Sequence, residues 1–427
     1  MEPLREKAIT VGVQLQLIQA ARFAASMEEL RNLAEACELD VVGEVTQKAE
    51  RVLSGTYIGS GKIQELKERM TAAQAGIAIF NDELSPSQIR NLEAELDCRV
   101  IDRTLLILDI FSSRAQTREA KLQVEVARLQ YMLPRLVGLR ESLGRQGGGS
   151  GLKNRGAGET KLELDRRRIE DRIAALREDL EKLVARRQIQ RQQRRKNEIP
   201  VVCLVGYTNA GKSSLLNAVI RKYSLGADKE VLAKDMLFAT LETSVRSIAL
   251  PNRRSFLLAD TVGFVSQLPH HLVKAFRSTL EEVREADLLL HVVDCSDPDS
   301  DKRIEVTKET LDELGAGGIP VLYVYNKADR APSQAYPEVT DEGIYLSARE
   351  GAGIEELVQL IGRSVFTDDL TCEVLIPFDQ GRLVSYFSEH AVIHTMCHEE
   401  NGTRLEMTCR EAEFEKFRHL FTTLSSL

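Results

Sequence analysis

The first 110 residues alternate short apolar runs with segments whose apolar residues recur every three or four positions. The runs predict strands and the periodic segments predict helices, and their alternation is typical of a parallel sheet covered by helices. We expect a Rossmann-like α/β subdomain over residues 1–110, with Ser26 as the N-cap of its first helix. The predicted strands are 8–15, 39–47, 75–80 and 98–102, and the predicted helices are 26–37, 62–70 and 85–96.

The pattern then changes to two heptad-like seams on either side of a glycine-rich run. Such a run does not stay helical, so the simplest structure is an antiparallel helical hairpin over residues 111–198. The second helix, 161–196, would extend about 54 Å, and Pro134 is placed to kink the first. The seam positions are Leu122, Val126, Leu129, Leu133 and Leu136 on the first helix, and Ile169, Ile173, Leu176, Leu180 and Leu183 on the second.

Two further α/β patterns complete the chain, one over residues 199–367 and a small one over residues 368–427. The chain is therefore predicted to be an α/β multidomain protein. In its last part we expect a strand at 372–377, a helix at 379–390, two strands that turn at Asn401-Gly402, and a helix at 411–424.

Composition narrows the class of protein without naming a chemistry. Apolar residues make up 43% and charged residues 29% of the 427, as in soluble globular proteins. No stretch approaches the roughly 20 apolar residues of a membrane span, and the first ten residues lack the apolar core of a signal peptide. The seven cysteines form no CxxC pair, which favours reduced thiols and a cytoplasmic location.

The net charge of −8 conceals one basic segment. Residues 135–198 contain 18 Lys and Arg against 10 Asp and Glu. An acidic protein with a basic arm suggests a local anionic partner, although a charged helix face that is simply solvated has the same composition.

The candidate chemistry begins with GYTNAGKS at residues 206–213, which follows the apolar run IPVVCLVG and opens a helical pattern. It matches G-x-x-x-x-G-K-[ST], in which backbone N–H groups close around a β-phosphate. Lys212 would reach the β- and γ-phosphates, and the Ser213 hydroxyl would ligate Mg²⁺. A structural glycine turn would not explain the Lys-Ser pair.

Three later strings, each at the end of a predicted strand, complete the nucleotide site, and the last two of them specify the base. Asp260 would hold Mg²⁺ through water, and the N–H of Gly263 would meet the γ-phosphate. In Asn326-Lys327-x-Asp329 the carboxylate can accept both N1–H and N2–H₂ of guanine, a pair that adenine does not offer. The Ser347-Ala348 pair would bring a backbone N–H to guanine O6. The sequence therefore predicts GTP as the substrate.

A switch threonine should bind Mg²⁺ only while the γ-phosphate is present. Thr240 is the expected residue and Thr243 the alternative. Phe264 stands where many GTPases have a water-positioning glutamine, so intrinsic hydrolysis should be slow, and the ring could also simply pack there. An asparagine at the position of Asn209 occurs in GTPases that recruit K⁺, which makes K⁺ a second candidate cofactor beside Mg²⁺.

These arguments give three overlapping sets of predicted site residues. Lys212, Thr240 and Gly263 are assigned to hydrolysis. Ser213, Thr240 and, through water, Asp260 are assigned to the metal. The residues assigned to the nucleotide are Gly206, Tyr207, Thr208, Asn209, Ala210, Gly211, Lys212, Ser213, Ser214, Asp260, Thr261, Val262, Gly263, Asn326, Lys327, Asp329, Ser347, Ala348 and Arg349.

The order of the parts and several strings resemble the HflX family of ribosome-associated GTPases over almost the whole chain. One departure is Ala157, which stands where the family usually has the proline of RGPGE. The matching strings are RQGGGSGLKNRGAGETKLELDRRRI at 145–169, GTYIGSGK at 55–62, FATLE at 238–242 and DTVGFVSQLPHHLVKAFRSTLEEVREADLLLHVVD at 260–294.

The resemblance implies a bacterial factor that binds the large ribosomal subunit and, with GTP, splits or rescues stalled ribosomes, with hydrolysis activated by the ribosome. It places Arg145, Lys153, Arg155 and Lys161 of the hairpin against ribosomal RNA. A long, stiff hairpin with a Gly/Arg tip could enter a narrow RNA-lined cavity. The triplet Arg166–Arg168 is as well explained by solvation as by RNA contact. We expect the free protein to be a monomer.

Two other functions compete with this one. A GTP-dependent ribosome assembly factor or RNA chaperone would use the same hairpin, and the sequence does not separate the two. A phosphotransferase conflicts with the guanine-reading string and the switch segment. GTYIGSGK is shorter than a Walker loop and has no Ser or Thr after Lys62, which favours a folded glycine turn over a second, ATP-binding site.

Overall fold

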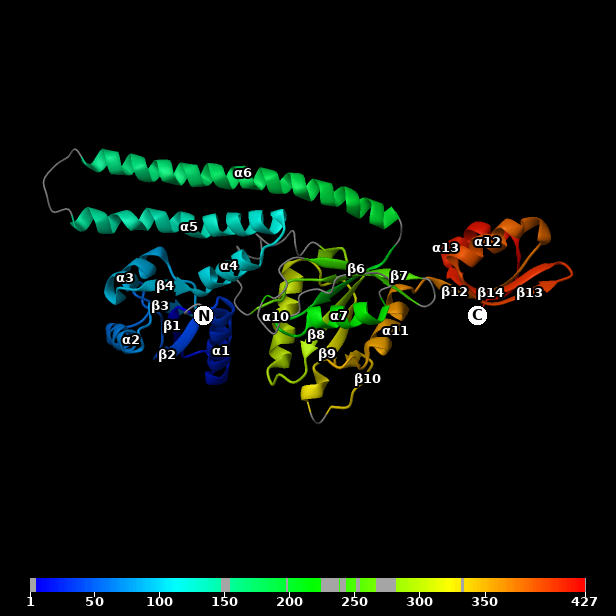
Figure 1. Ribbon diagram of the computed structural model, residues 1–427, viewed down its shortest axis with the longest axis horizontal. Helices are drawn as coiled ribbons and strands as arrows, with labels where there is room; N and C mark the ends of the chain where they lie inside the picture. The colour runs from blue at the N-terminus through cyan, green and yellow to red at the C-terminus, as the bar shows by residue number, and fades with distance from the viewer. Residues whose placement is uncertain are drawn as a thin grey trace.

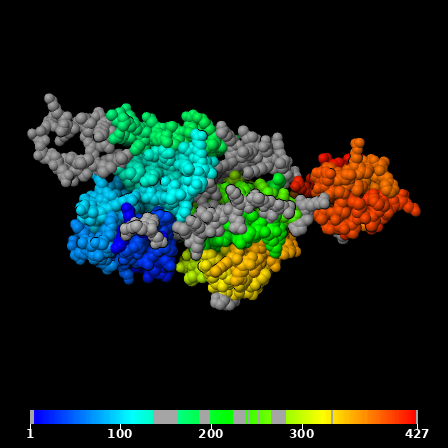
Figure 2. Space-filling view, viewed as in Figure 1, coloured from blue at the N-terminus to red at the C-terminus, as the bar shows by residue number. Residues whose placement is uncertain are grey.

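The computed structural model describes residues 5–146, 154–196, 199–223, 238, 243–250, 254–265, 282–331 and 334–426. Three separate sheets and a long helical hairpin make up this part of the chain (Figure 1). Figure 2 shows the C-terminal residues as a lobe of their own at one end of the molecule. None of the helices in the described ranges is long and apolar enough to cross a lipid bilayer.

The N-terminal sheet is parallel and four-stranded, in the order β2-β1-β3-β4. Helices α2 and α3 pack on one face and helices α1 and α4 on the other, so the central strand β1 is buried almost throughout. The elements are β1 (Lys7–Leu15), α1 (Ala20–Ala36), β2 (Asp40–Ala49), α2 (Ser60–Ala73), β3 (Ile77–Phe80), α3 (Pro86–Leu96), β4 (Arg99–Asp102) and α4 (Arg103–Arg114).

The first helix begins earlier than Ser26, so the prediction of that residue as an N-cap was wrong. Helix α1 starts at Ala20 without a side-chain cap, because its alanine-rich first turns favour the helix and Phe23 already packs in the core. Ser26 lies inside the helix, where its Oγ accepts a hydrogen bond of 2.9 Å from Nδ2 of Asn81.

The hairpin consists of α5 (Arg118–Gln146) and α6 (Asn154–Lys196). Helix α5 continues through Pro134, and α6 starts at Asn154, seven residues before the predicted 161, so its first turns contain Gly156 and Gly158. The expectation that the whole glycine-rich run is non-helical was therefore wrong for these two residues. The narrow apolar seam is formed by Leu122, Val126, Leu129, Ile169, Ile173, Leu176 and Leu180.

The central sheet has seven strands in the order β10-β11-β9-β8-β5-β7-β6, parallel except at its two edge pairs. Helices α7 and α11 pack on one face and α10 on the other. The elements are β5 (Val201–Val205), α7 (Lys212–Tyr223), β6 (Ser244–Ala249), β7 (Ser255–Asp260), β8 (Leu288–Asp294), α10 (Ser300–Glu313), β9 (Val321–Asn326), β10 (Glu338–Val339), β11 (Gly343–Tyr345) and α11 (Ile354–Val365).

The C-terminal sheet is antiparallel in the order β13-β14-β12-β15. The helix expected at 411–424 ends at Phe417, and the chain then enters β15, because Thr422 and its neighbours pair with the edge of β12. The elements are β12 (Asp369–Ile376), α12 (Gly381–His390), β13 (Val392–Glu399), β14 (Gly402–Arg410), α13 (Glu411–Phe417) and β15 (Thr422–Ser426).

Candidate functional site

A glycine loop joins β5 to α7 at the carboxyl end of the central sheet, where ligands of α/β folds bind. Gly206 has φ +138° and Gly211 has φ +94°, both in the region that favours glycine. A Cβ on Gly206 would lie 2.3 Å from the carbonyl oxygen of Val292, and one on Gly211 would lie 2.2 Å from Nδ2 of Asn326. The backbone of the loop therefore packs so tightly against its neighbours that only glycine fits at these two positions.

Lys212, the first residue of α7, is buried against this loop with 6% of its surface exposed. Its Nζ donates hydrogen bonds to the carbonyl oxygens of Gly206 at 2.9 Å and Tyr207 at 2.8 Å. Burial lowers the pKa of the ammonium group to about 8, partly opposed by the charge of Asp260. The side chain is therefore fixed in the loop and desolvated, which strengthens its attraction for an anion.

Two predicted metal ligands lie in contact. Oγ of Ser213 donates to Oδ2 of Asp260 at 2.6 Å, although Ser213 lies in the first turn of α7 and Asp260 ends strand β7. A hydroxyl and a carboxylate at this spacing are the hard oxygen ligands that Mg²⁺ prefers. The residues present therefore fit the metal. The neighbouring Thr261 is fully buried, and its hydroxyl donates to the carbonyl of Leu204 at 2.6 Å, which holds this strand end to β5.

The segment after Asp260 closes over the loop. Thr208 N donates to the carbonyl of Phe264 at 2.8 Å, and Phe264 N donates to that of Gly206 at 3.2 Å. Gly263 leaves no room for a side chain, because a Cβ would lie 2.9 Å from Nζ of Lys212. Phe264 is 1% exposed and belongs to the apolar cluster under the loop, so its ring packs away from solvent.

The residues predicted to read the base converge from two strand ends. Nδ2 of Asn326 donates to the carbonyl of Ala210 at 2.9 Å, and its Oδ1 accepts from Ala348 N at 3.0 Å, so this amide ties the phosphate loop to the Ser-Ala turn. Ser347 Oγ donates to Oδ1 of Asp329 at 2.7 Å, which orients a half-buried carboxylate.

Asp294 contacts the predicted site and was not singled out from the sequence. It ends β8, beside Asn326 in the register of the sheet, and its Oδ2 pairs with Nζ of Lys327 at 2.8 Å. Its other oxygen accepts from the backbone N and the hydroxyl of Ser296. The signal available was its position at the end of a buried strand next to the one that carries Asn326-Lys327.

The loop also contacts the N-terminal domain. The Tyr207 hydroxyl donates to the carboxylate of Glu29 on α1, and Glu29 pairs with the buried guanidinium of Arg103 on α4. Nearby, the rings of Phe111 and Phe238 meet edge to face with centroids 4.7 Å apart. A polar chain and an aromatic pair therefore connect the nucleotide loop and one residue of the predicted switch segment to the N-terminal helices.

The remaining predicted residues fall into two groups. Asn209 is exposed with φ +62°, Ser214 is half-buried on α7, Val262 is buried, Arg349 is exposed, and the alternative threonine Thr243 precedes β6. Thr240 lies outside the described residues, as does Lys153. The side chains of Arg145, Arg155 and Lys161 also lie outside the described part.

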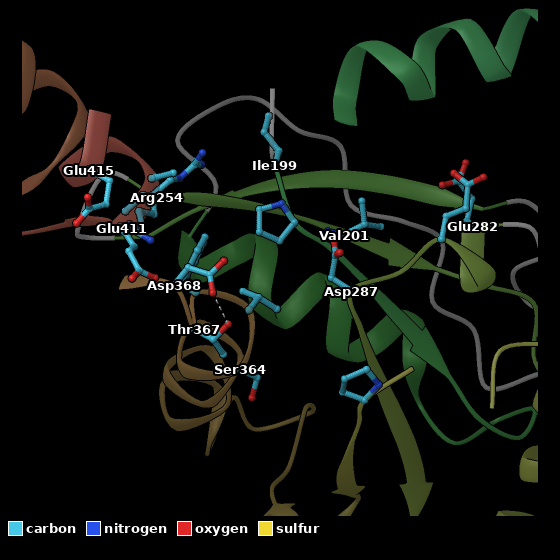
Figure 3. Close-up of a pocket in the computed structure, with 17 residues that line it drawn as sticks. Ile199, Val201, Arg254, Glu282, Asp287, Ser364, Thr367, Asp368, Glu411 and Glu415 are labelled. Carbon is cyan, nitrogen blue, oxygen red and sulfur yellow. Dashed lines mark hydrogen bonds between the residues drawn. The ribbon is translucent and has the colours of Figure 1, made fainter. Parts of the chain in front are cut away.

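A cavity of about 1100 Å³ lies elsewhere, where the central domain meets the start of the C-terminal one (Figure 3). Arg254 and Arg410 stand among several acidic groups in its wall, and none of the predicted nucleotide residues lines it. The acidic lining residues are Glu282, Glu285, Asp287, Asp368, Glu411 and Glu415. This cavity does not have the chemistry of a phosphate site.

The fold and the site define a P-loop nucleotide-binding domain of the guanine-specific type, and comparison with known proteins agrees. Three family models match the chain: GTP-binding GTPase N-terminal over residues 24–112, GTP-binding GTPase Middle Region over 114–194, and 50S ribosome-binding GTPase over 201–327. GTPase HflX of Caldanaerobacter subterraneus subsp. tengcongensis is 46% identical over 96% of this chain and 92% of its own length. GTPase HflX of Escherichia coli is 41% identical over 88% of each chain.

The chain belongs to the HflX family of GTPases and hydrolyses GTP to GDP and phosphate. Among solved structures, a GTP-binding protein from the archaeon Sulfolobus solfataricus in complex with GDP is 25% identical, with a TM-score of 0.44 over 85% of this chain and 99% of that one.

Proposed function

We propose that the chain is a GTP-driven switch that binds the large ribosomal subunit in the cytoplasm and splits or rescues stalled ribosomes. The observation that carries the proposal is the helical hairpin, which no nucleotide chemistry requires. The matching model for residues 201–327 describes a 50S ribosome-binding GTPase, which supports the choice of partner.

The hairpin is long, and contacts between its two helices make it stiff. Helix α6 has 43 residues and is about 65 Å long at 1.5 Å per residue. Its apolar seam is reinforced by Arg172, whose Nε and Nη2 both bond Oε1 of Glu125, and by Arg118, which pairs with Asp179 at 3.2 Å. Two helices locked side by side can carry a basic tip into an RNA-lined cavity that is too narrow for a domain.

The basic residues of the arm do not all have the same role. Arg166, Arg167 and Arg168 are exposed and each pairs with a carboxylate of its own helix, at 2.8, 3.4 and 3.5 Å. Such pairs support a solvated face for the triplet, since they contribute little and use the charge locally. We therefore assign RNA contact to the tip, Arg145, Lys153, Arg155 and Lys161.

At the nucleotide site we propose the following roles. Lys212 contacts the β- and γ-phosphates, Ser213 and, through water, Asp260 would hold Mg²⁺, and Asp329 reads guanine. When bound, Mg²⁺ supplies charge neutralisation on the phosphates. Thr240 senses the γ-phosphate with Gly263, and the exposed Asn209 recruits K⁺ at the rim of the loop.

Phe264 supports a dependence on the partner. Its buried ring offers no polar group to orient a water molecule, so efficient hydrolysis needs a group from elsewhere. We propose that the large subunit completes the site.

A splitting experiment tests the proposal. Purified 70S ribosomes mixed with the chain and a non-hydrolysable GTP analogue should lose light scattering as they separate into subunits. Deletion of residues 147–151 should abolish this splitting and leave slow intrinsic GTP hydrolysis unchanged, because none of the deleted residues is assigned to the nucleotide. Intact 70S particles in the presence of the full chain would contradict a splitting function, and an equal loss of both activities on deletion would contradict a separate RNA-facing tip.

A further inference from the structure

On one face of the central sheet, the described residues do not form the crossover helix that usually joins two neighbouring parallel strands. Strands β9 and β11 are parallel neighbours, and such strands are usually joined by a crossover helix that covers the sheet. The described residues of this connection form only a 3₁₀ turn at Ala328–Arg330 and the short strand β10. Helix α10 covers β8 on this side, and the part of the face over β9 and β11 has no helix from the described residues.

Three tyrosines occupy the uncovered area. Tyr323 and Tyr325 alternate along β9 with residues that pack in the core on the other face, and Tyr345 lies beside Tyr325 on β11. Together with His291 of β8 they form a row of rings with centroid separations of 5.2, 6.0 and 4.5 Å. We call Tyr323, Tyr325 and Tyr345 the tyrosine face.

The tyrosine face borders a groove. A cavity of about 560 Å³ runs between α10 and β9, lined by Ile304, Lys308, Tyr323 and Tyr325 among others. Val321, which also lines the groove, is 41% exposed, which is high for a valine that begins a sheet strand. The three tyrosines are half-buried, and their hydroxyls form no hydrogen bond to a described residue. Apolar surface and free phenol groups are therefore available together.

The rim of the groove is acidic. Asp341 and Glu342 line it, Glu338 stands opposite Tyr345 in the register of β10, and Asp301 lies at the start of α10. All four are exposed, against one cation in the lining, Lys308, which sits 5.7 Å over the ring of Tyr323. Burial, and after it Tyr345 and Glu342, raise the pKa of Tyr325. Its hydroxyl therefore stays protonated at neutral pH and can donate a hydrogen bond.

The geometry argues against RNA as the occupant. Base stacking needs free ring faces, and here the ring faces of Tyr325 and Tyr345 are already turned to each other, with 14° between their planes. The four carboxylates would also repel a phosphate backbone.

We infer that the tyrosine face is a docking site for a basic segment of a protein of the large ribosomal subunit. This inference rests on the proposed function for the choice of partner, and on charge complementarity for its chemistry. Aliphatic groups of the partner would fill the groove over the tyrosines, where the missing crossover helix would pack, while its Lys and Arg side chains meet the rim. In Figure 1, β9 and β10 lie on the side of the central domain away from the hairpin, so both contacts can form at once.

Photocrosslinking from the groove tests the inference. The full chain with Tyr323→p-benzoylphenylalanine is bound to purified large subunits with guanylyl imidodiphosphate, sedimented, irradiated and treated with ribonuclease. A crosslink to a basic ribosomal protein is the expected result. A crosslink to ribosomal RNA, a crosslink to a second copy of the chain, or none in a complex that sediments would overturn it. If the chain does not sediment with the subunits, the proposed function itself fails.

A charge variant provides the matched control. In the crosslinking chain, Asp341→Lys with Glu342→Lys should lower the crosslink yield about fivefold, because rim charges govern encounter and salt sensitivity. Glu389→Lys with Glu400→Lys makes the same charge change on exposed residues of the C-terminal domain and should leave the yield unchanged. Equal yields from the two double variants would contradict an electrostatic contact at the rim.

Discussion

Two glycine-rich segments of this chain share most of their residue types but differ in backbone geometry and in the burial of their lysine. In GYTNAGKS the glycines have positive φ and no space for a Cβ, and the lysine is buried. In GTYIGSGK a Cβ on Gly59 would meet only ordinary contacts at 3.7 Å, and one on Gly61 would meet nothing within 4 Å. Lys62 lies in the first turn of α2 and pairs with Glu65 of the same helix at 2.7 Å. What distinguishes the phosphate loop is therefore a backbone that only glycine can adopt, folded around a buried lysine. Composition alone does not reveal this difference.

The largest contrast should come from the two lysines. Lys212→Ala removes the cation that we place on the phosphates and should weaken GTP binding by about 100-fold or more, since charge-assisted hydrogen bonds are worth about 1.5–3 kcal/mol each. Lys62→Ala should leave binding unchanged. Titration of a fluorescent GTP analogue measures both constants, and tight binding by the Lys212 variant would refute the phosphate assignment.

The glycines should differ next. Gly206→Ala drives a Cβ into the carbonyl of Val292 at a φ of +138°, and should cost the central domain about 2–4 kcal/mol of unfolding free energy. Gly61→Ala lies in the first turn of α2 with open space around it, and should change the stability of the N-terminal domain by less than about 1 kcal/mol, in the favourable direction. Urea unfolding followed by domain-specific hydrogen exchange separates the two, and equal losses would mean that the backbone contrast is not energetic.

The buried ammonium of Lys212 gives the site a pH dependence. Its pKa is lowered to about 8, so the free site loses this proton as pH rises through 8, whereas bound phosphates favour the charged form. GTP affinity should therefore fall by up to about tenfold per pH unit above 8. Calorimetry at pH 8.5 in buffers of different ionisation enthalpy should show proton uptake on binding. A flat profile from pH 7 to 9, or proton release, would contradict the placement of this group.

The smallest effect should come from the tyrosine that follows Gly206. Tyr207→Phe removes the hydroxyl that donates to Glu29 and keeps the aromatic ring. Hydrogen exchange should rise in α1 and in the loop, while GTP affinity changes less than about threefold, because the hydroxyl points to the N-terminal domain and not into the loop. A large loss of affinity would mean that this tyrosine is part of the nucleotide site and not of the contact between domains.

The sequence revealed most where chemistry is local. The loop 206–213, Asp260, Asn326 and Asp329 each follow a strand and carry a spacing that their chemistry demands, and the structure brings them to one sheet edge. The start of α1 was missed because Gln19 provides no side-chain cap, and Ser26 could be mistaken for one.

Long-range features were out of reach of pattern reasoning. The contact from Tyr207 to Glu29 spans 178 positions and depends on how two domains dock. The tyrosine face is uncovered because the described residues between β9 and β11 form no helix. The short connection between these strands does not reveal this from its sequence. The strand β15 was read as the end of a helix because its pairing partner lies about 50 residues earlier.

The most direct test of the account is the rate of GTP hydrolysis in potassium buffer, measured for the chain alone and with purified large ribosomal subunits. The account predicts a slow intrinsic rate and a rise of tenfold or more with subunits, equivalent to about 1.4 kcal/mol off the barrier. An unchanged rate would not affect the assignment of the guanine site. It would contradict the claim that the large subunit supplies the polar group that Phe264 lacks for orienting a water molecule.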